Sequence, residues 1–413
     1  MEEAARRLIE SMPEKLRKEH EKIISALKDA VAEGKSIVVF ADTDADGASA
    51  EAWRIIAKKL GARDENIEVR HVDRSNVKFD RDAFYIVHDI TLLPAHLQNV
   101  AAGAKIVNID HHGPRLGEDE SYDTVLNHPA VVAVANPFAT EVDSPGKTKM
   151  SREDSSRLYA FNPSAQLVHI AHRVGANDMI YKLAAIGIVG DRAHQYSDVA
   201  REFAEAVARK TSATIEDLAK LAGLFELQEN FPGKVTAEEI KADILAGLRE
   251  NDLKSIPRSK KLRELLEKKE KVLEKYLERV KRGEYEKEEL EVNGKPVRII
   301  LIHVDDDDAK EVQKIKSDLG SALLDKFSKD PTPTVVLAGQ WEPGDVVNYR
   351  IGVNGAGQDI GLHAGEIART LSSRFELPGG GHAAVGGSKI PHSEKERAME
   401  HIKDVLKSIY GQH

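Results

Sequence analysis

Three consecutive side chains that can bind a metal ion follow a short apolar stretch in the N-terminal half of the chain. Residues 104–109 are rich in Ala, Ile and Val and predict a buried strand, and Asp110, His111 and His112 come directly after it. One carboxylate and two imidazoles at a strand end suit a transition metal. For an isolated triplet, the alternative is a pair of histidines buried in the core, and this stretch alone does not exclude it.

A group of acids follows an earlier apolar strand. Residues 36–41 predict this strand, and Asp42, Asp44 and Asp46 come next at alternate positions, before a helix expected over 48–60. Three carboxylates in so small a volume raise one another's pKa unless a cation is present. A solvated turn with a helix N-cap needs only one acid and is the weaker explanation. An EF-hand is excluded, because the stretch that would supply its late glutamate ligand is already helical.

Two more acids stand at the ends of predicted elements. Residues 84–87 predict a third strand shortly before Asp89, and a helix expected over 178–189 precedes Asp191. The alternation of strands and helices predicts a parallel sheet with right-handed crossovers. Sites in such sheets lie at the carboxyl ends of the strands, so we expect Asp89 to join the two earlier groups there. For Asp191 alone, a polar residue that merely ends a helix is the stronger explanation.

A run with almost no side-chain bulk lies near the C-terminus. Gly379, Gly380 and Gly381 precede His382 and follow a helix expected over 364–375. Glycines let the backbone approach a ligand closely, and successive amide groups in such a loop favour an anion. A glycine-rich loop is often only a turn, but the single histidine within it makes an anion site the more specific prediction.

The composition limits the chemistry that these residues can perform. The 413-residue chain contains no cysteine, so disulfides and thiolate sites are excluded and a metal site must use Asp, Glu and His. The net charge of -9 argues against a protein coated in basic residues, although a local basic groove for nucleic acid is compatible with it. No apolar run approaches the roughly 20 residues of a membrane span, and no signal peptide is recognisable. We therefore expect a cytoplasmic protein without a membrane partner.

The pattern along the chain predicts several structural parts. We expect N-terminal helices over 1–34, a parallel α/β domain over 35–196, a charged helical connector over 197–290 and a smaller α/β domain over 291–413. Solvated ion pairs explain the charges of the connector, and homo-oligomerisation through this helical block is left open. Further expected elements are helices over 94–102 and 309–327, a surface loop over 139–156, and a strand over 346–353 that contains Arg350.

The ordered set of motifs resembles the DHH phosphoesterase superfamily. The Asp-x-Asp-x-Asp-Gly form of the first motif is most similar to RecJ-like nucleases, and the helical block resembles that of archaeal RecJ homologues. The resemblance implies an α/β fold in which a parallel-sheet DHH domain is joined by the helical connector to a smaller DHH-associated domain, with the active site in the cleft between them. It extends over about residues 35–195 and 292–395, and its motifs are residues 42–47, 88–89, 110–112, 190–191 and 379–382.

By residue matching, the resemblance implies a centre of two divalent metal ions. Mixed carboxylate and imidazole ligands suit Mn²⁺ better than Mg²⁺, with Co²⁺ as a further alternative. Two such ions about 3.5–4 Å apart would activate water and neutralise the phosphoryl oxygens during an in-line displacement. Asp110 would orient an imidazole, and His112 would contact the scissile phosphate. The implied metal ligands are Asp42, Asp44, Asp46, Asp89, His111 and Asp191, and the implied substrate contacts are Arg350, Arg192, Gly379, Gly380, Gly381 and His382.

These expectations favour an Mn²⁺-dependent exonuclease on single-stranded DNA or RNA in replication or repair, with a replication or helicase protein left open as a partner. The first alternative is a phosphodiesterase or phosphatase for short oligonucleotides, cyclic dinucleotides or nucleotide bisphosphates. Relatives of that kind often begin the first motif with His, where this chain has Phe40. The second alternative is a Cdc45-like replication scaffold without activity, which the intact metal motifs disfavour.

Overall fold

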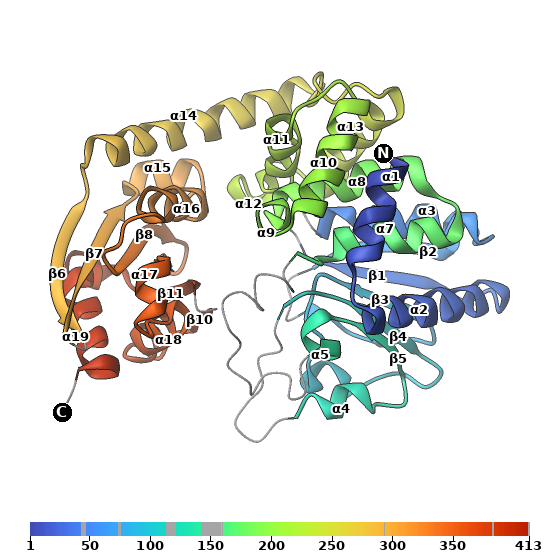
Figure 1. Cartoon of the computed structure of the whole chain (residues 1–413), viewed down its shortest axis with the longest axis horizontal. Helices are drawn as coiled ribbons and strands as arrows, with labels where there is room; N and C mark the ends of the chain where they lie inside the picture. The colour runs from blue at the N-terminus through green and yellow to red at the C-terminus, as the bar shows by residue number, and fades with distance from the viewer. Residues whose placement is uncertain are drawn as a thin grey trace. The chain divides into compact units, whose positions relative to one another are not determined.

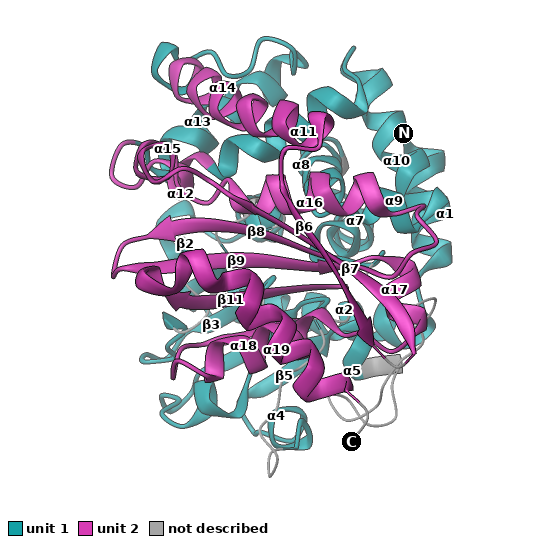
Figure 2. Cartoon of the chain, turned by 90° about the vertical axis from the view of Figure 1, so that its left-hand side faces the viewer, with its two compact units in different colours: residues 1–226, 235–262 teal, residues 227–234, 263–413 magenta. Residues whose placement is uncertain are grey.

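The computed structural model describes residues 1–42, 47–72, 76–112, 121–141, 158, 160–292, 294–381 and 384–411. The chain forms two compact units, shown along the chain in Figure 1 and by unit in Figure 2. Unit 1 comprises residues 1–226 and 235–262, and unit 2 comprises residues 227–234 and 263–413. The helical block expected over 197–290 is thus divided between the units, and the four-part division of the chain stays a prediction. Asp44, Asp46, His382 and most of the loop expected over 139–156 lie outside the described residues.

Unit 1 contains, among its described residues, a parallel sheet of five strands in the order β2-β1-β3-β4-β5. The chain proceeds from β1 to β2 on one side and places β3 on the other side of β1, so the order reverses between β1 and β3. Ligands of open α/β sheets bind beyond the carboxyl ends of the strands at such a switch point. The strands are β1 (Ile37–Ala41), β2 (Ile67–His71), β3 (Phe84–His88), β4 (Lys105–Ile109) and β5 (Val131–Ala135).

Both faces of this sheet are covered. β1 and β3 are buried along their whole length, as expected for parallel strands between two layers. Phe40 and Tyr85 stack on one face with ring centroids 5.8 Å apart, and α2 packs on β5 and α7. The helices of unit 1 are α1 (Glu2–Ser11), α2 (Glu14–Ala32), α3 (Glu51–Lys59), α4 (Asp123–Leu126), α5 (Pro137–Glu141), α7 (Pro163–Val174), α8 (Asn177–Gly190), α9 (Ala193–Tyr196), α10 (Asp198–Lys210), α11 (Ile215–Phe225) and α13 (Ala237–Glu250), with 3-10 turns η1 (Gly47–Ala50), η2 (Asp64–Asn66) and η4 (Pro94–Leu97).

Unit 2 contains, in its described part, a mixed sheet of six strands in the order β10-β11-β9-β8-β7-β6. β7 and β8 are parallel and the other neighbours are antiparallel. α18 and α19 pack on one face over Val347, Tyr349 and Ile351 (Figure 2). The strands are β6 (Glu286–Val292), β7 (Lys295–His303), β8 (Thr334–Glu342), β9 (Val346–Val353), β10 (Gly379–Gly381) and β11 (Val385–Pro391). The helices are α12 (Leu227–Asn230), α14 (Lys260–Arg282, whose first three residues belong to unit 1), α15 (Asp306–Glu311), α16 (Lys316–Phe327), α17 (Gly355–Asp359), α18 (Ala364–Ser373) and α19 (Ala398–Tyr410), with the 3-10 turn η5 (His392–Arg397).

Three local predictions are wrong. The helix expected over 94–102 is only the turn η4, because the backbone that follows bonds elsewhere, with Ala101 N–H donating to the Phe79 carbonyl at 2.7 Å. The helix expected over 309–327 is divided into α15 and α16, since Lys314 between them has a φ of 60°. The glycine run is not a loop, because β10 pairs with β11 as a sheet edge.

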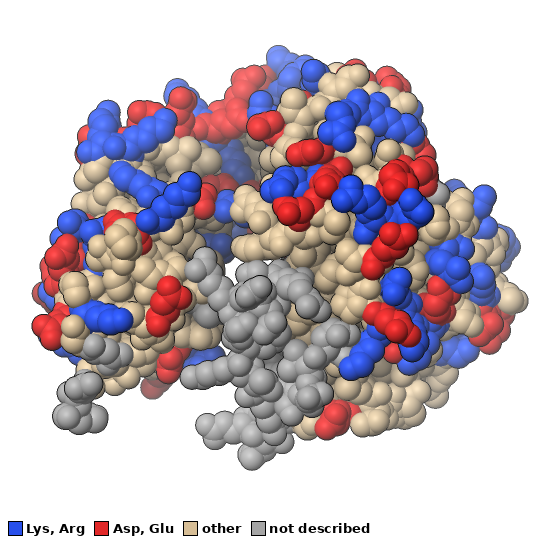
Figure 3. Space-filling model, viewed as in Figure 1, with Lys and Arg blue, Asp and Glu red and all other residues tan. Residues whose placement is uncertain are grey.

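Charged side chains of both signs alternate over the face in Figure 3 rather than gathering in one block. This mixture agrees with a moderate net charge of -9. None of the helices in the described part of the chain combines the length and the apolar character that a bilayer crossing requires.

Two histidines are buried in contact between α2 and α7. His20 Nδ1 lies 2.9 Å from His169 Nδ1, and His20 Nε2 lies 2.9 Å from Gln166 Oε1. The Gln166 amide nitrogen donates to backbone carbonyls, so its oxygen must accept the proton of His20 Nε2. His169 then donates from Nδ1 to His20. Burial lowers the pKa of His20 to about 3 and that of His169 to about 4, so both rings are neutral in the fold at pH 7.

This pair predicts a loss of stability in mild acid. The unfolded histidines bind protons with a pKa of about 6.5, whereas the folded ones do not, so the free energy of unfolding falls as the pH drops from 7 towards 4. We expect each histidine to contribute a loss of about 2 kcal/mol between pH 7 and pH 5. Urea unfolding at the two pH values measures the loss. A His20→Gln/His169→Gln variant should show a weaker pH dependence, and an equal dependence in both proteins would contradict the assignment.

Candidate metal centre

The carboxyl ends of three neighbouring strands place the predicted acids at the same edge of the sheet. The register pairs Ala41 of β1 with His88 of β3, and His88 with Ile109 of β4. Asp42, Asp89 and Asp110 are each the next residue along the chain, so they leave the sheet side by side. The first two border the switch point between β1 and β3, where the order of strands reverses.

Asp89, His111 and His112 form a compact group of possible metal ligands. Each offers one ligand atom, and these atoms lie within 4.8 Å of one another. Asp89 is 1% exposed and His111 is 2% exposed, whereas the His112 side chain is 17% exposed, so the group is open to solvent on the side of His112. Asp89 has a φ of 59°, a left-handed conformation that is uncommon for a residue other than glycine and that occurs often at functional sites.

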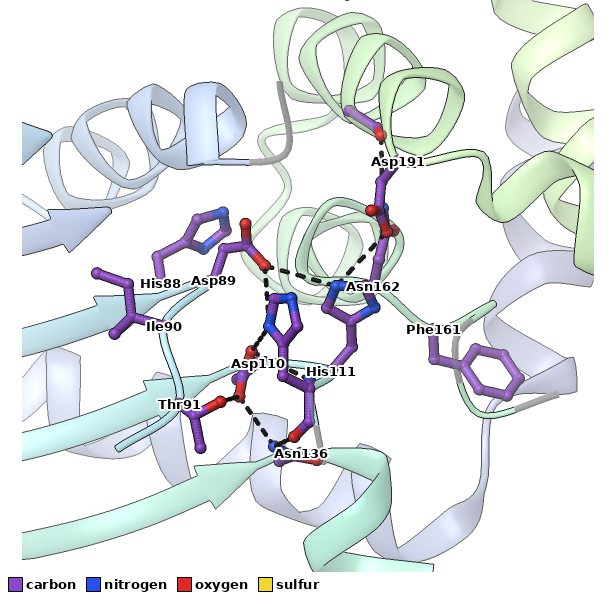
Figure 4. A network of polar contacts seen from close by, with 12 residues as sticks. His88, Asp89, Ile90, Thr91, Asp110, His111, Asn136, Phe161, Asn162 and Asp191 are labelled. Carbon is purple, nitrogen blue, oxygen red and sulfur yellow. Dashed lines mark hydrogen bonds and ion pairs between the residues drawn. The ribbon is translucent and has the colours of Figure 1, made fainter. Parts of the chain in front are cut away.

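Asp191 completes this arrangement from a helix. It is the C-cap of α8, and its Oδ2 lies 3.5 Å from His111 Nε2, while Asp89 Oδ1 lies 3.6 Å from the same nitrogen. Figure 4 shows these three side chains converging. Separations of roughly 3–3.5 Å are expected between donors that share an ion at about 2.1 Å, so the spacing and the mixed carboxylate and imidazole donors fit a divalent metal.

Asp110 fixes the orientation of His112. Its Oδ1 accepts the proton of His112 Nδ1 at 2.7 Å, and its Oδ2 accepts from Thr91 Oγ1 at 2.9 Å and Asn136 Nδ2 at 3.1 Å. Burial acts to raise the pKa of Asp110, but its interaction with the His112 imidazole, which includes a hydrogen bond, outweighs burial, so this pKa is lowered and the carboxylate is ionised. Because Nδ1 of His112 carries the proton, its Nε2 is the atom that can bind a metal or accept a proton.

His88 has a different task from the histidines that follow β4. Trp53 Nε1–H donates to His88 Nδ1 at 3.2 Å, so Nε2 carries the ring proton and contacts Ser49 Oγ at 3.0 Å. The two ring nitrogens of His88 therefore contact one residue each, Ser49 of η1 and Trp53 of α3. This arrangement fixes the start of the helix that follows the first acidic motif.

The backbone carbonyl of Asp42 is also closely surrounded. The Asp42 carbonyl accepts from His71 Nδ1 at 2.9 Å. A Cβ on Gly47 would lie 2.1 Å from this carbonyl oxygen, so only glycine fits there. Asp42 itself is half-buried at the end of β1.

The predicted substrate contacts lie in two different places. Arg192 follows Asp191 directly, with a φ of 59° at the N-cap of α9. Arg350 and the three glycines belong to unit 2, where Arg350 pairs with Gly387 and the glycines form β10. The structure therefore brings Asp89, Asp110, His111, His112 and Asp191 together within unit 1, and it places the glycine set on a separate sheet.

Three polar residues at this centre were not identified from the sequence. Thr91 and Asn136 hold the Asp110 carboxylate, and Asn162 Nδ2 donates to Asp191 Oδ2 at 3.3 Å (Figure 4). Asn136 stands directly after β5, so its position at a strand end was a usable signal. Thr91 had no comparable pattern, and Asn162 is also the N-cap of α7, which explains its type without reference to the site.

Replacing Asp110 tests how the centre is positioned. Asp110→Asn removes the charge that fixes the proton on His112 Nδ1, so we expect Mn²⁺ affinity to fall about 10–100-fold while the fold is retained. Calorimetric titration with Mn²⁺ and the circular dichroism spectrum measure the two quantities. Asp64→Asn, at an acid that is 57% exposed and paired with Arg54, is the matched control. Equal Mn²⁺ affinity in the two variants would rule out this role.

No protein-family model matches the sequence, and no curated protein matches it. Solved structures match nearly the whole chain. A DHH-domain protein described as a member of a family of ribosomal proteins is 20% identical, with 98% of this chain and 96% of that chain covered and a TM-score of 0.63. RecJ with Mn²⁺ from Thermus thermophilus is 17% identical, with 96% of this chain and 55% of that chain covered and a TM-score of 0.59. Cdc45 from Entamoeba histolytica is 9% identical, with 95% and 99% covered and a TM-score of 0.52.

These similarities concern the arrangement of the chain in space. This chain spans about half the length of the Thermus thermophilus RecJ, since 55% of that protein is covered. A parallel-sheet domain followed by a smaller α/β domain is the architecture that the motifs imply, and the sheet of the second unit is mixed. The resemblance is confirmed at the level of the fold: the chain has the fold of DHH-domain proteins.

Proposed function

We propose that this chain is a metal-dependent phosphoesterase that hydrolyses single-stranded DNA or RNA as a RecJ-like exonuclease in replication or repair. The observation that supports this most is the approach of Asp89, His111 and Asp191 at the carboxyl end of the parallel sheet. Packing of the core does not by itself require Asp89 and His111 to be buried together beside a third polar group, Asp191, because burying polar groups is costly. One similar solved structure is described as exonuclease RecJ bound to manganese.

The donor set favours Mn²⁺ over Mg²⁺, because it mixes an imidazole with carboxylates. We assign Asp89, His111 and Asp191 to the ligands, together with Asp42, Asp44 and Asp46 by motif matching. Two bound ions would supply activation of water and neutralisation of phosphate charge. Mg²⁺ and Co²⁺ remain the alternatives for the same ligands.

The other residues of the centre position the substrate. The Asp110 carboxylate holds a proton on His112 Nδ1, so His112 Nε2 would bind an ion as an unprotonated nitrogen or donate to the scissile phosphate as a protonated one. Arg192, next to Asp191, is the further phosphate contact that we assign to unit 1. In unit 2 we assign the following phosphates to Arg350, His382 and the glycines of β10.

The finer parts of the proposal come from the sequence. The first motif and the helical block support an archaeal RecJ-like protein. We also propose that it acts in the cytoplasm, and a replication or helicase protein is left open as its partner. The first alternative is a phosphodiesterase or phosphatase that acts on short oligonucleotides, cyclic dinucleotides or nucleotide bisphosphates in place of a long strand. The scaffold alternative is related in fold through Cdc45, and it predicts no hydrolysis.

One experiment separates these three functions. A labelled strand of about 30 nucleotides, long enough to fill a single-strand groove, and a dinucleotide are each incubated with Mn²⁺, Mg²⁺, Co²⁺ or a chelator. The proposal predicts stepwise shortening of the long strand with a divalent ion and none with the chelator. Cleavage of the dinucleotide alone would reject the strand exonuclease in favour of the short-substrate activity, and no cleavage of either would favour the scaffold.

Removing the central imidazole should abolish the reaction. His111→Ala deletes a ligand that contacts both Asp89 and Asp191, so we expect kcat to fall about a hundredfold or more. Circular dichroism checks that the variant is folded. His172→Ala, at an exposed histidine of α7, is the control and should retain activity. Undiminished turnover in the folded His111→Ala protein would remove this metal assignment.

Arg350→Ala should weaken the binding of substrate more than it slows the chemical step. A phosphate contact outside the metal centre stabilises the bound strand in the ground state and transition state alike, so we expect KM to rise about tenfold at nearly constant kcat. Steady-state kinetics on the long strand measures both constants. The control is Arg397→Ala, at a 60% exposed residue that pairs with Glu394 and Glu400. A fall in kcat with KM unchanged would contradict this role.

A further inference from the structure

The two faces of the sheet in unit 2 differ in character. One face is the apolar core beneath α18 and α19. Because side chains alternate along a strand, Asn348 and Arg350 of β9 point to the opposite face. The register places Asn348 beside Lys389 and Arg350 beside Gly387, so these four residues form one polar strip across β9 and β11.

This β9–β11 strip carries little side-chain bulk on the side of β11. Gly387 is exposed, and no heavy atom of the described residues lies within 4 Å of a Cβ built on it. On the side of β8, α16 covers the sheet: a Cβ on Gly320 would lie 2.6 Å from Arg350 Cγ. The aliphatic stem of Arg350 is therefore fixed against a helix, next to an open glycine surface that can admit the backbone of a ligand.

Positive and negative side chains around the strip are unequal in number. Lys316 Nζ lies 2.7 Å from Glu342 Oε1, and Lys389 Nζ lies 3.3 Å from Glu342 Oε2. Asn348 Nδ2 also donates to this carboxylate, at 2.9 Å. Two lysines thus share one acid on this face. An anion bound here would offset the excess.

The burial of these groups increases the effect of the charge. Lys316 is 8% exposed and Glu342 is 14% exposed, whereas Lys389 is 36% exposed and can contact a ligand. Burial lowers the pKa of Lys316, and the like charges of Lys314 and Lys389 act in the same direction against the attraction of Glu342. Lys316 is also the first residue of α16, so the N-terminus of this helix adds to the positive potential.

We infer that Lys389 and Asn348 bind a second phosphate of a single-stranded nucleic acid, next to the phosphate that Arg350 and the glycines bind. Residues two apart on a strand are separated by roughly 6.7 Å, a spacing comparable with that of neighbouring phosphates in an extended strand. Glu342 has a positioning role, because it holds the Asn348 amide and keeps Lys389 across the strip. The inference rests on the proposed function, and it favours a strand with several phosphates over a dinucleotide.

Binding measurements test this without any need for hydrolysis. Fluorescence anisotropy, in chelator, gives the Kd of a labelled strand of about ten nucleotides at several salt concentrations. For Lys389→Gln we expect Kd to rise about threefold to tenfold and the salt dependence to fall by ~0.7 in slope, the value for one phosphate contact on a single strand. Unlabelled dinucleotide and inorganic phosphate are the competitors, and the preference for the long strand over both should decrease.

Two further variants separate charge from packing. Lys389→Arg keeps the charge and should bind within about twofold of the parent protein, since phosphate contacts depend mainly on charge. The matched control is Lys403→Gln on α19, at a lysine that pairs with Glu288 on the other side of the sheet. Unchanged binding in Lys389→Gln, or equal weakening in the Arg and Gln variants, would overturn the inference.

The outcome is distinguishable from that of the hydrolysis experiment. If the parent protein does not cleave a strand but Lys389→Gln weakens strand binding as expected, the proposed function is wrong and the phosphate site is correct. If the parent protein cleaves the strand and Lys389→Gln binds it normally, the reverse holds.

Discussion

The ionised Asp110 carboxylate, buried at the end of β4, is the constraint on which the centre depends. A charge that is 0% exposed is costly unless its oxygens are bound. Here Thr91, Asn136 and His112 bind them, and these residues lie in the segments that follow three different strands. Satisfying this one charge therefore holds the segments after β3, β4 and β5 in place. His111, next along the chain, is directed towards Asp89 and Asp191 as a result.

The parallel sheet places the remaining acids by its register and order. A parallel sheet brings the carboxyl ends of its strands to one edge, and the reversal between β1 and β3 leaves space there. Mutual repulsion of carboxylates at that edge opposes folding, and a bound cation would relieve it. In unit 2 the imbalance has the opposite sign, because Lys316 and Lys389 share a single carboxylate. A cation in one unit and a polyanion on the other are the two ligands that the proposed function requires.

Much of the fold could be predicted from the sequence, because its main signals are local. The strands β1, β3 and β4 are apolar runs, and an acid follows each of them. Asp191 was ambiguous in isolation, since a polar residue at the end of a helix is common, and only the tertiary structure places it 3.5 Å from His111. The acid run and His382 lie partly outside the described residues, so the roles of Asp44, Asp46 and His382 stay predictions.

The remaining features depend on contacts between distant parts of the chain. The glycine run forms β10 because it pairs with β11. No local sequence pattern predicts this pairing. Glu342 and Lys389 lie on different strands, far apart in the sequence, and each alone resembles an ordinary surface charge. Their importance is visible only in the sheet, because alternate residues of a strand lie on opposite faces, and here one face is apolar and the other polar.

The central claim is that Asp89, His111 and Asp191 surround divalent ions. Crystals grown with Mn²⁺ and measured at the manganese absorption edge would test it most directly. The account predicts two anomalous peaks about 3.5–4 Å apart, within coordination distance of these three side chains. Peaks at other positions, or none at this centre at saturating Mn²⁺, would contradict it.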